Sequence, residues 1–234
     1  MGAIYRREMG NYFTTPVGYI FLAVFFFFSG FYFAGRCLLE NTSDLSEVFS
    51  SMFIICVFLI PLLTMRLMSE ERRNRTDQLL LTAPVGLLGL VMGKYLAALS
   101  IYAMGTGAMP LFGVLLTALG AADWAMMLAH MAGLLLLGAA LTATGMLISA
   151  LTESQVAAAV GSIAAGLLLI MANAAASMLQ DGIPRRILRS LAFGSHYVRF
   201  TQGIVDLPDA VFFLSVAAVC IFLTIRVFER RRWR

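Results

Sequence analysis

The chain has 234 residues, of which 60% are hydrophobic and only 13% are charged. Soluble domains carry charge on roughly a quarter of their residues, so this composition excludes an ordinary soluble domain. The formal net charge of +4 is small, and we interpret it as a sign of membrane topology rather than of nucleic-acid binding.

Long stretches without a charged residue decide the fold class, because a helix needs about 20 mostly apolar residues to cross a bilayer. Five stretches are long enough, and a sixth becomes so when Arg226 extends its stem to the interface; they are residues 9–35, 48–65, 95–122, 124–152, 154–180 and 210–225. The sequence therefore predicts an all-α integral membrane protein whose residues 1–234 form a single transmembrane domain. The six expected transmembrane helices are residues 17–36, 48–66, 93–118, 124–150, 154–177 and 210–228.

Residues 2–14, ahead of the first span, have the pattern of an amphipathic helix. Their apolar side chains recur at helical spacing while the polar ones face elsewhere: Tyr5, Met9, Tyr12 and Phe13 against Arg6, Arg7 and Asn11. Such a helix lies in the membrane interface. Pro16 then turns the chain into the first span.

The distribution of Lys and Arg predicts the orientation, since cytoplasmic segments carry an excess of both. Twelve of the 17 fall on one side: Arg6, Arg7, Arg66, Arg72, Arg73, Arg75, Lys94, Arg226, Arg230, Arg231, Arg232 and Arg234. The other side has Arg36, Arg185, Arg186, Arg189 and Arg199. We therefore expect both termini in the cytoplasm and the protein in the cytoplasmic membrane.

The segment between the second and third spans, residues 65–85, crowds charges of both signs between two apolar runs. Ser69 can cap a first turn, and Thr76 can cap a short helix over 77–82 that Pro84 ends. Leu79 and Leu80 form an apolar ridge on this helix, which suits a socket on a soluble partner. A merely solvated loop is the alternative.

Three features within the spans have a simple expected role. The segment 105–110, GTGAMP, is poorly suited to a straight helix. Small residues at every fourth position of the fifth span (Ala157, Gly161 and Ala165, beside Ala158, Ser162 and Gly166) favour close helix packing. His130, inside the fourth span, is expected to be a hydrogen-bonded structural histidine rather than part of a proton relay.

No catalytic set of residues is recognisable. Residues 89–95, GLVMGKY, are one residue short of the phosphate-loop spacing and end in Tyr. The three cysteines, Cys37, Cys56 and Cys220, lie in or beside spans without metal-ligand spacing. We expect no enzyme activity, cofactor or metal in this chain.

Residues 178–209, between the last two spans, are predicted to form two short amphipathic helices on the outer side of the membrane. Pro184 can open the first, and Gly194-Ser195 is expected to separate it from the second. Arg185, Arg186 and Arg189 share a face of the first and, with Arg199, could meet anionic lipid or an acidic substrate. A solvated outer face explains them equally well.

Two motifs make the chain resemble ABC-2 type permeases. The first is EERR at 70–73 followed by TDQLLLTAP at 76–84, which resembles the coupling-helix region of that family. The second is SHYVRFTQGIVDLPDAVFFL at 195–214 with the terminal RRW at 231–233. This second pattern is similar to the sequences of one branch of the family, which contains the gliding-motility-type and nitrous-oxide-reductase maturation permeases.

The resemblance implies a half-transporter that contains no nucleotide site of its own. Two permease copies, or two related permeases, would pair above two ATPase subunits, which would hold ATP and Mg²⁺; an accessory membrane protein of the gliding-motility type is a further expected partner. The contact with the ATPase would use Glu70, Glu71, Arg72, Arg75, Thr76, Leu79 and Leu80. The outer helices would be re-entrant elements of an extracellular gate, with Arg185, Arg186, Arg189, Tyr197 and Phe200 as candidates.

The leading hypothesis is the transmembrane subunit of an ABC exporter in the lipid bilayer. The alternative from another class is a membrane scaffold that anchors an ATPase-driven assembly or maturation complex and moves no substrate. A self-powered channel or secondary carrier ranks third.

Overall fold

The computed structural model describes residues 2–73, 86–118, 123–179 and 182–232, and these residues form helices joined by loops. Six helical segments are long and apolar enough to cross a membrane: Pro16–Leu38, Ser46–Arg73, Leu87–Ala118, Trp124–Leu151, Gln155–Ala172 and Leu207–Arg230. The prediction of an all-α membrane protein with six spans is confirmed.

The elements follow one another in a simple order. They are α1 (Gly2–Thr14), α2 (Pro16–Phe33), the π-helical turn η1 (Ala34–Leu38), α3 (Ser46–Thr64), α4 (Ser69–Arg73), α6 (Leu87–Thr106), α7 (Pro110–Ala118), α8 (Trp124–Leu151), α9 (Gln155–Met178), α10 (Ile183–Leu191), α11 (Phe193–Thr201) and α12 (Leu207–Arg232). The predicted helix over 77–82 lies outside the described residues.

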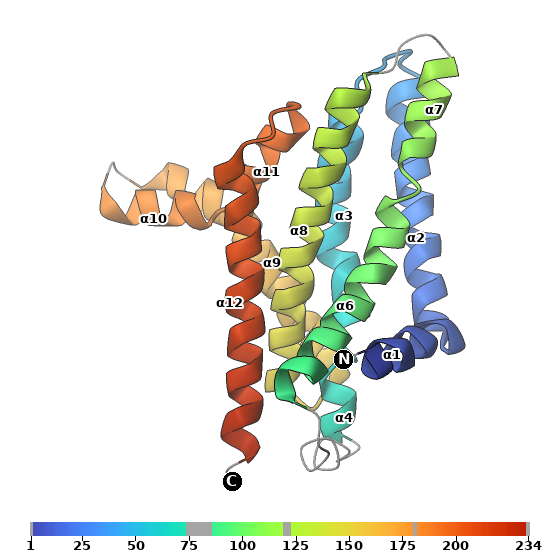
Figure 1. Cartoon of the computed structure of the whole chain (residues 1–234). Coiled ribbons are helices and arrows are strands. Elements are labelled where there is room, and N and C mark those ends of the chain that lie inside the picture. Colours follow the sequence, from blue (N-terminus) through green and yellow to red (C-terminus); the bar gives the residue numbers. More distant parts are fainter. Residues whose placement is uncertain (1, 74–85, 119–122, 180–181, 233–234) are drawn as a thin grey trace.

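The long helices run between two ends of a bundle (Figure 1). One end, called the α4 end, contains α4, both termini and α1, which lies across the helix axes. The opposite end, called the α7 end, contains α7 and the loop that leads into α3. The two short helices α10 and α11 follow α9, and α10 projects sideways from the bundle.

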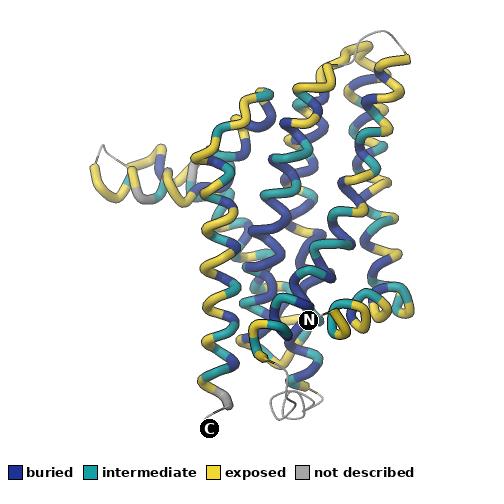
Figure 2. Tube along the Cα trace, in the orientation of Figure 1, coloured by how far each residue is buried: buried dark blue, intermediate teal, exposed yellow. Residues whose placement is uncertain are grey.

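The core is centred on α3 and α8. In the most apolar 18-residue stretch of each of these spans, 61% and 67% of the residues are buried, against 28% or less in the spans of α2, α9 and α12. Figure 2 shows the same contrast, with buried residues inside the bundle and exposed ones along its outer helices. The exposed side chains on those outer helices are largely apolar, including Phe27, Leu168 and Phe222. They are surfaces suited to lipid or to another membrane protein.

Helix α8 is central because its glycines let three other helices approach closely. A Cβ atom at each position would collide with a buried neighbour: Gly133 with Phe200 of α11, Gly138 with Tyr102 of α6, and Gly145 with Thr64 of α3. Small residues play the same role on α9, where Ala158 and Ser162 are buried. The structure supports the predicted packing role for Ala158, Ser162 and Gly166, whereas Ala157 is exposed and Gly161 and Ala165 are only half-buried.

The third span differs from its predicted form in two ways. It starts at Leu87 rather than at residue 93, and residues 107–109 divide it into α6 and α7. The break confirms that residues 105–110 do not make a straight helix. Pro110 begins α7, where its missing N–H costs no helical hydrogen bond.

The contact between α8 and α6 gives a first prediction. Gly138→Ala should destabilise the protein by about 1–3 kcal/mol, because the added methyl group overpacks a site closed by Tyr102. Tyr102 cannot easily move, since it is fully buried and its hydroxyl donates to the carbonyl of Leu134 at 2.7 Å. Thermal unfolding in detergent is the measurement.

Gly30→Ala on α2 is the matched control, because a Cβ there meets nothing within 4 Å. Alanine is a better helix former than glycine, so this variant should melt at the parental temperature or above. Equal melting temperatures for the two alanine variants would contradict the packing role of Gly138.

Candidate functional site

Four charged side chains join α1, α4 and α6 at the α4 end, and we call them the Lys94 cluster. The Nζ atom of Lys94 lies 3.0 Å from Oε1 of Glu8 and 2.9 Å from Oε1 of Glu71. A guanidinium nitrogen of Arg7 lies 2.9 and 3.0 Å from the same two oxygens. Each carboxylate therefore lies between two cations, and three helices share one charge network.

The centre of this cluster is shielded from water. The side chain of Lys94 is only 2% exposed, and those of Glu8 and Glu71 are each 10% exposed. Removing one member of a buried ion pair leaves an uncompensated charge, which costs much more than an exposed pair contributes. The cluster thus holds α1, α4 and α6 at fixed relative positions.

The electrostatics of Glu8 follow from its neighbours. Burial alone would raise the pKa of the Glu8 carboxyl, but attraction and hydrogen bonding from Lys94 and Arg7 outweigh it, so the pKa lies below the ordinary value of 4.5. Glu8 is therefore ionised at neutral pH.

Helix α1 is also anchored through two tyrosines. The hydroxyl of Tyr12 donates to the carbonyl of Leu63 at the end of α3, at 2.8 Å. Burial raises the pKa of Tyr12, so this phenol stays protonated and can donate. Tyr5 adds a hydroxyl contact of 3.0 Å with Ser100 of α6.

Ser149, near the end of α8, organises the turn between α3 and α4. Its hydroxyl oxygen accepts the N–H groups of Met68 and Ser69, both at 3.1 Å, and donates to the carbonyl of Met65 at 3.1 Å. These are backbone groups that a helix end leaves without intrahelical partners.

Arg72 makes a second link from α4 to α8 and α9. Its guanidinium lies 2.9 Å from Oε1 of Glu153, in the turn between those helices, and 3.4 Å from the carbonyl of Ala150. The short helix α4 is therefore bonded to α1 and α6 on one side and to the α8–α9 turn on the other.

The structure places three of the seven predicted ATPase-contact residues. Glu70 is partly exposed and pairs with Arg66 of its own segment at 2.9 Å, whereas Glu71 and Arg72 are bonded within the chain as described. The contact with an ATPase stays a prediction for all three. Arg75, Thr76, Leu79 and Leu80 lie outside the described residues.

Sequence reasoning missed Lys94, Glu8 and Ser149 as members of this site. One signal was present, because Glu8 is the sole acidic residue among the first 39. An acid on an otherwise basic interfacial helix indicates an internal cation as its partner. Lys94 was counted among the cytoplasmic cations and is part of the incomplete phosphate-loop motif, but neither pattern indicates that it is buried.

At the α7 end the two predicted short helices are present, and the predicted aromatic candidates hold α11 in place. Tyr197 is buried, stacks on Phe53 with ring centroids 4.9 Å apart, and donates its hydroxyl to the carbonyl of Phe49 at 2.9 Å. Phe200 is buried against Gly133. Their role in a gate stays a prediction.

The predicted break between these helices is wrong by two residues. It falls at Ala192, and Gly194 lies inside the first turn of α11. Buried Phe193 explains the shift, because its ring packs edge-on against Phe213 of α12 at 5.3 Å and fixes the start of α11.

The arginine candidates lie on α10. Arg186 is exposed and Arg185 is half-buried, while the side chain of Arg189 is not among those that the structure describes. Arg199, on α11, lies 3.2 Å from Asp206 and 3.5 Å from the buried Asp209. Arg199 therefore serves contacts within the chain.

His196 joins α10, α11 and α12 at the same place. Its Nδ1 atom is 2.6 Å from Oδ1 of Asp209, its Nε2 atom is 3.2 Å from the carbonyl of Ser190, and its ring stacks on Phe212 at 4.0 Å. Sequence reasoning did not single out His196 or Asp209.

The fold and these contacts define a multi-pass helical membrane protein with an ion-linked assembly of short helices at one end. The family model for the ABC-2 family transporter protein matches residues 40–226. The chain belongs to this family and is thus a transmembrane permease of an ABC transporter. Membership of the family implies an ABC ATPase as its partner. No curated protein matches it.

Removing the central cation tests the Lys94 cluster. Lys94→Met should destabilise the protein by about 3–5 kcal/mol, because Glu8 and Glu71 lose their shared ammonium group in a buried site. Adding Glu8→Gln should recover part of the loss, because it removes the surplus negative charge that remains beside Arg7. Melting temperatures in detergent measure both effects.

Arg226→Gln is the control, since it breaks a pair with Glu229 in which both side chains are well exposed. Such pairs contribute about 0–1 kcal/mol. If Lys94→Met melts no earlier than Arg226→Gln, the cluster does not hold the helices together.

The lowered pKa of Glu8 predicts a specific pH dependence. Its stabilising effect should be complete above the ordinary value of 4.5 and should disappear as the pH falls through the lower value of the folded state. Melting temperatures of the parent and of Glu8→Gln should therefore differ at pH 7 and converge in acid. A difference that persists unchanged to pH 3 would refute the assignment.

Proposed function

We propose that this chain is the permease subunit of an ABC exporter in the cytoplasmic membrane, with the α4 end in the cytoplasm. A separate ATPase subunit, which holds ATP and Mg²⁺, docks at that end. Family membership supplies the class of protein. The direction of transport, the orientation and the docking site are the additional elements of the proposal.

The observation that carries the proposal is the bonding of α4. This helix leads directly into the segment that resembles a coupling helix, and its side chains bond to α1, α6 and the α8–α9 turn. A displacement imposed on α4 is passed to these elements, because buried ion pairs resist separation. Since α6 and α8 are spans, force applied at the surface would reach the membrane helices.

The charge distribution supports the orientation. In the topology of the six spans, the α4 end contains both termini and ten of the 15 Lys and Arg residues that the structure describes. Cytoplasmic segments are enriched in these residues. The termini, α1 and α4 would then face the compartment in which ATP is available.

The exposed apolar faces support pairing with another permease. In helices α2, α9 and α12 at most 28% of the residues of the apolar stretch are buried in a single chain. We propose two permease copies, or two related permeases, above two ATPase subunits. Placement in the gliding-motility or nitrous-oxide-reductase maturation branch, with an accessory membrane protein, belongs to the same proposal.

Charge reversal at Glu70 tests the docking site. Glu70→Arg should reduce co-purification of the ATPase and ATP-dependent transport by about tenfold, the effect of losing one well-formed charged contact. Glu70 is suited to this test because, within the part of the chain that the structure describes, it pairs with Arg66, and this pair is local and partly exposed. The permease should therefore still fold, as its melting temperature would verify.

Glu40→Arg is the matched control. Glu40 also pairs with an arginine four residues earlier, Arg36, but at the α7 end. It should leave ATPase binding unchanged. Equal behaviour of the two reversals would place the docking site elsewhere, and normal ATPase binding with no substrate movement in vesicles would favour a membrane scaffold.

A further inference from the structure

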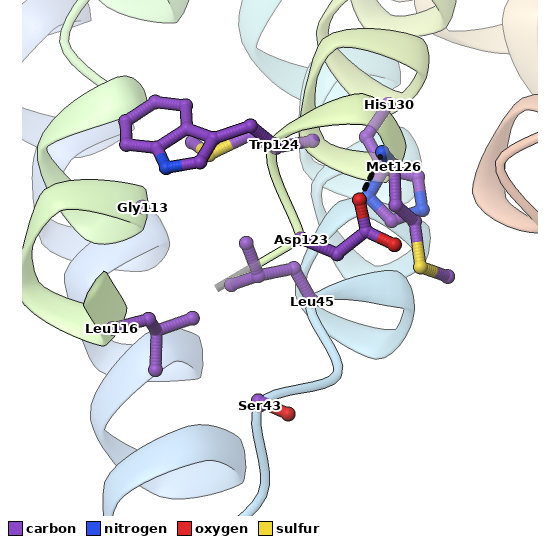
Figure 3. Close-up of a pocket in the computed structure, with 9 residues that line it drawn as sticks. Ser43, Leu45, Gly113, Leu116, Asp123, Trp124, Met126 and His130 are labelled. Carbon is purple, nitrogen blue, oxygen red and sulfur yellow. Dashed lines mark hydrogen bonds between the residues drawn. The ribbon is translucent and has the colours of Figure 1, made fainter. Parts of the chain in front are cut away.

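A pocket at the α7 end has features of a ligand site. Its cavity volume is about 20 Å³, a little more than one water molecule needs, and it lies where α7, α8 and the loop before α3 meet (Figure 3). Apolar side chains such as Leu45, Leu116 and Trp124 line it together with the polar Asp123 and His130. The pocket is separated from the Lys94 cluster by most of the length of α8.

The most informative group in the pocket wall is the His130 ring. This residue is 1% exposed, and its Nε2 atom lies 2.9 Å from the carbonyl oxygen of Thr201. A carbonyl can only accept, so Nε2 carries a proton and Nδ1 of the neutral ring is an acceptor. The predicted structural hydrogen bond is therefore present, but it uses only one of the two nitrogens.

The other nitrogen, Nδ1, is buried and has no hydrogen-bond partner among the described residues. An unsatisfied buried acceptor is unfavourable. The same tautomer is used where a histidine presents its second nitrogen to a ligand, with the first held by a backbone carbonyl. Because His130 lines the pocket, a small ligand there that reaches Nδ1 would supply the missing donor.

The neighbouring charges are negative. Asp123 caps α8 through Oδ1, which accepts the N–H groups of Ala125 and Met126 at 3.0 and 3.2 Å; no hydrogen bond within the described ranges uses its Oδ2 atom. Hydrogen bonds from Ser46 lower the pKa of Asp44, which lies in the chain between the lining residues Ser43 and Leu45. The lining residues include no Lys or Arg.

Acceptors, negative charge and an aromatic ring together define one class of ligand. We propose that this pocket binds a small organic ammonium ion, whose N–H groups donate to Nδ1 of His130 and to the carboxylate of Asp123. The Trp124 ring is part of the same wall, with its edge against Gly113 of α7. This site does not depend on ATPase docking, so it can be tested on the permease alone.

Trp124 allows a direct test, because the chain has only one other tryptophan. The full chain with Trp233→Phe is placed in lipid nanodiscs, and Trp124 emission is followed during titration with methylammonium chloride against sodium chloride at equal ionic strength. Methylammonium should cause a saturable change. Acetamide, a neutral donor of similar size, should cause none.

Substitution of Asp123 separates binding from folding. Asp123→Asn and Asp123→Ser keep a residue that caps helices but remove the charge. Both should raise the apparent Kd for methylammonium by about tenfold, the effect of one charge-assisted hydrogen bond. Glu40→Gln, which removes an acid outside the pocket at the same end, should leave the Kd unchanged.

Three results would overturn the proposal. They are a methylammonium response that does not saturate, Asp123 variants with the parental Kd, and an equal response to acetamide. The last result would mean that the pocket takes neutral donors such as water. None of these results would bear on ATPase docking, which the Glu70 reversal tests separately.

Discussion

The requirement that a buried charge remain paired controls the α4 end of this protein. Lys94 is placed in the interior, where an ammonium group is unfavourable unless opposite charges surround it. Glu8 and Glu71 supply those charges from α1 and α4, and Arg7 balances the second carboxylate. If α1, α4 or α6 moved away, the others would be left with an uncompensated charge. The interfacial helix α1, the short polar helix α4 and the membrane span α6 therefore behave as one unit.

The rest of the molecule connects to that unit through α8. At the α4 end Ser149 binds the turn before α4, along the helix glycines admit α3, α6 and α11, and at the α7 end Asp123 and His130 line the pocket. The carbonyl partner of His130 belongs to α11. A single straight helix thus links the site proposed for energy input with the outer helices and the pocket.

The sequence predicted the parts of this fold that depend on local composition. Six apolar runs, the amphipathic residues 2–14 and the irregular residues 105–110 are local patterns, and all three became the expected structure. The start of the third span was misplaced because Lys94 was treated as a boundary, as is usual for a charged residue beside an apolar run. Its burial depends on Glu8, which is 86 residues away in the chain, and no local pattern contains that pairing. The same holds for His130, whose free nitrogen can be recognised only once Thr201 is known to bind the other.

The Lys94 cluster also constrains the order in which the chain is assembled in the membrane. The ribosome makes α1 and its carboxylate first, α4 second, and α6 with the ammonium group last. Until Lys94 is made, the two carboxylates have only Arg7 between them, so the charge of the group is balanced only after two spans have been made. Completion of α6 then neutralises the group in one step. A chain without α1 would bury the same lysine with one counter-ion fewer, which is unfavourable for an ammonium group in the interior.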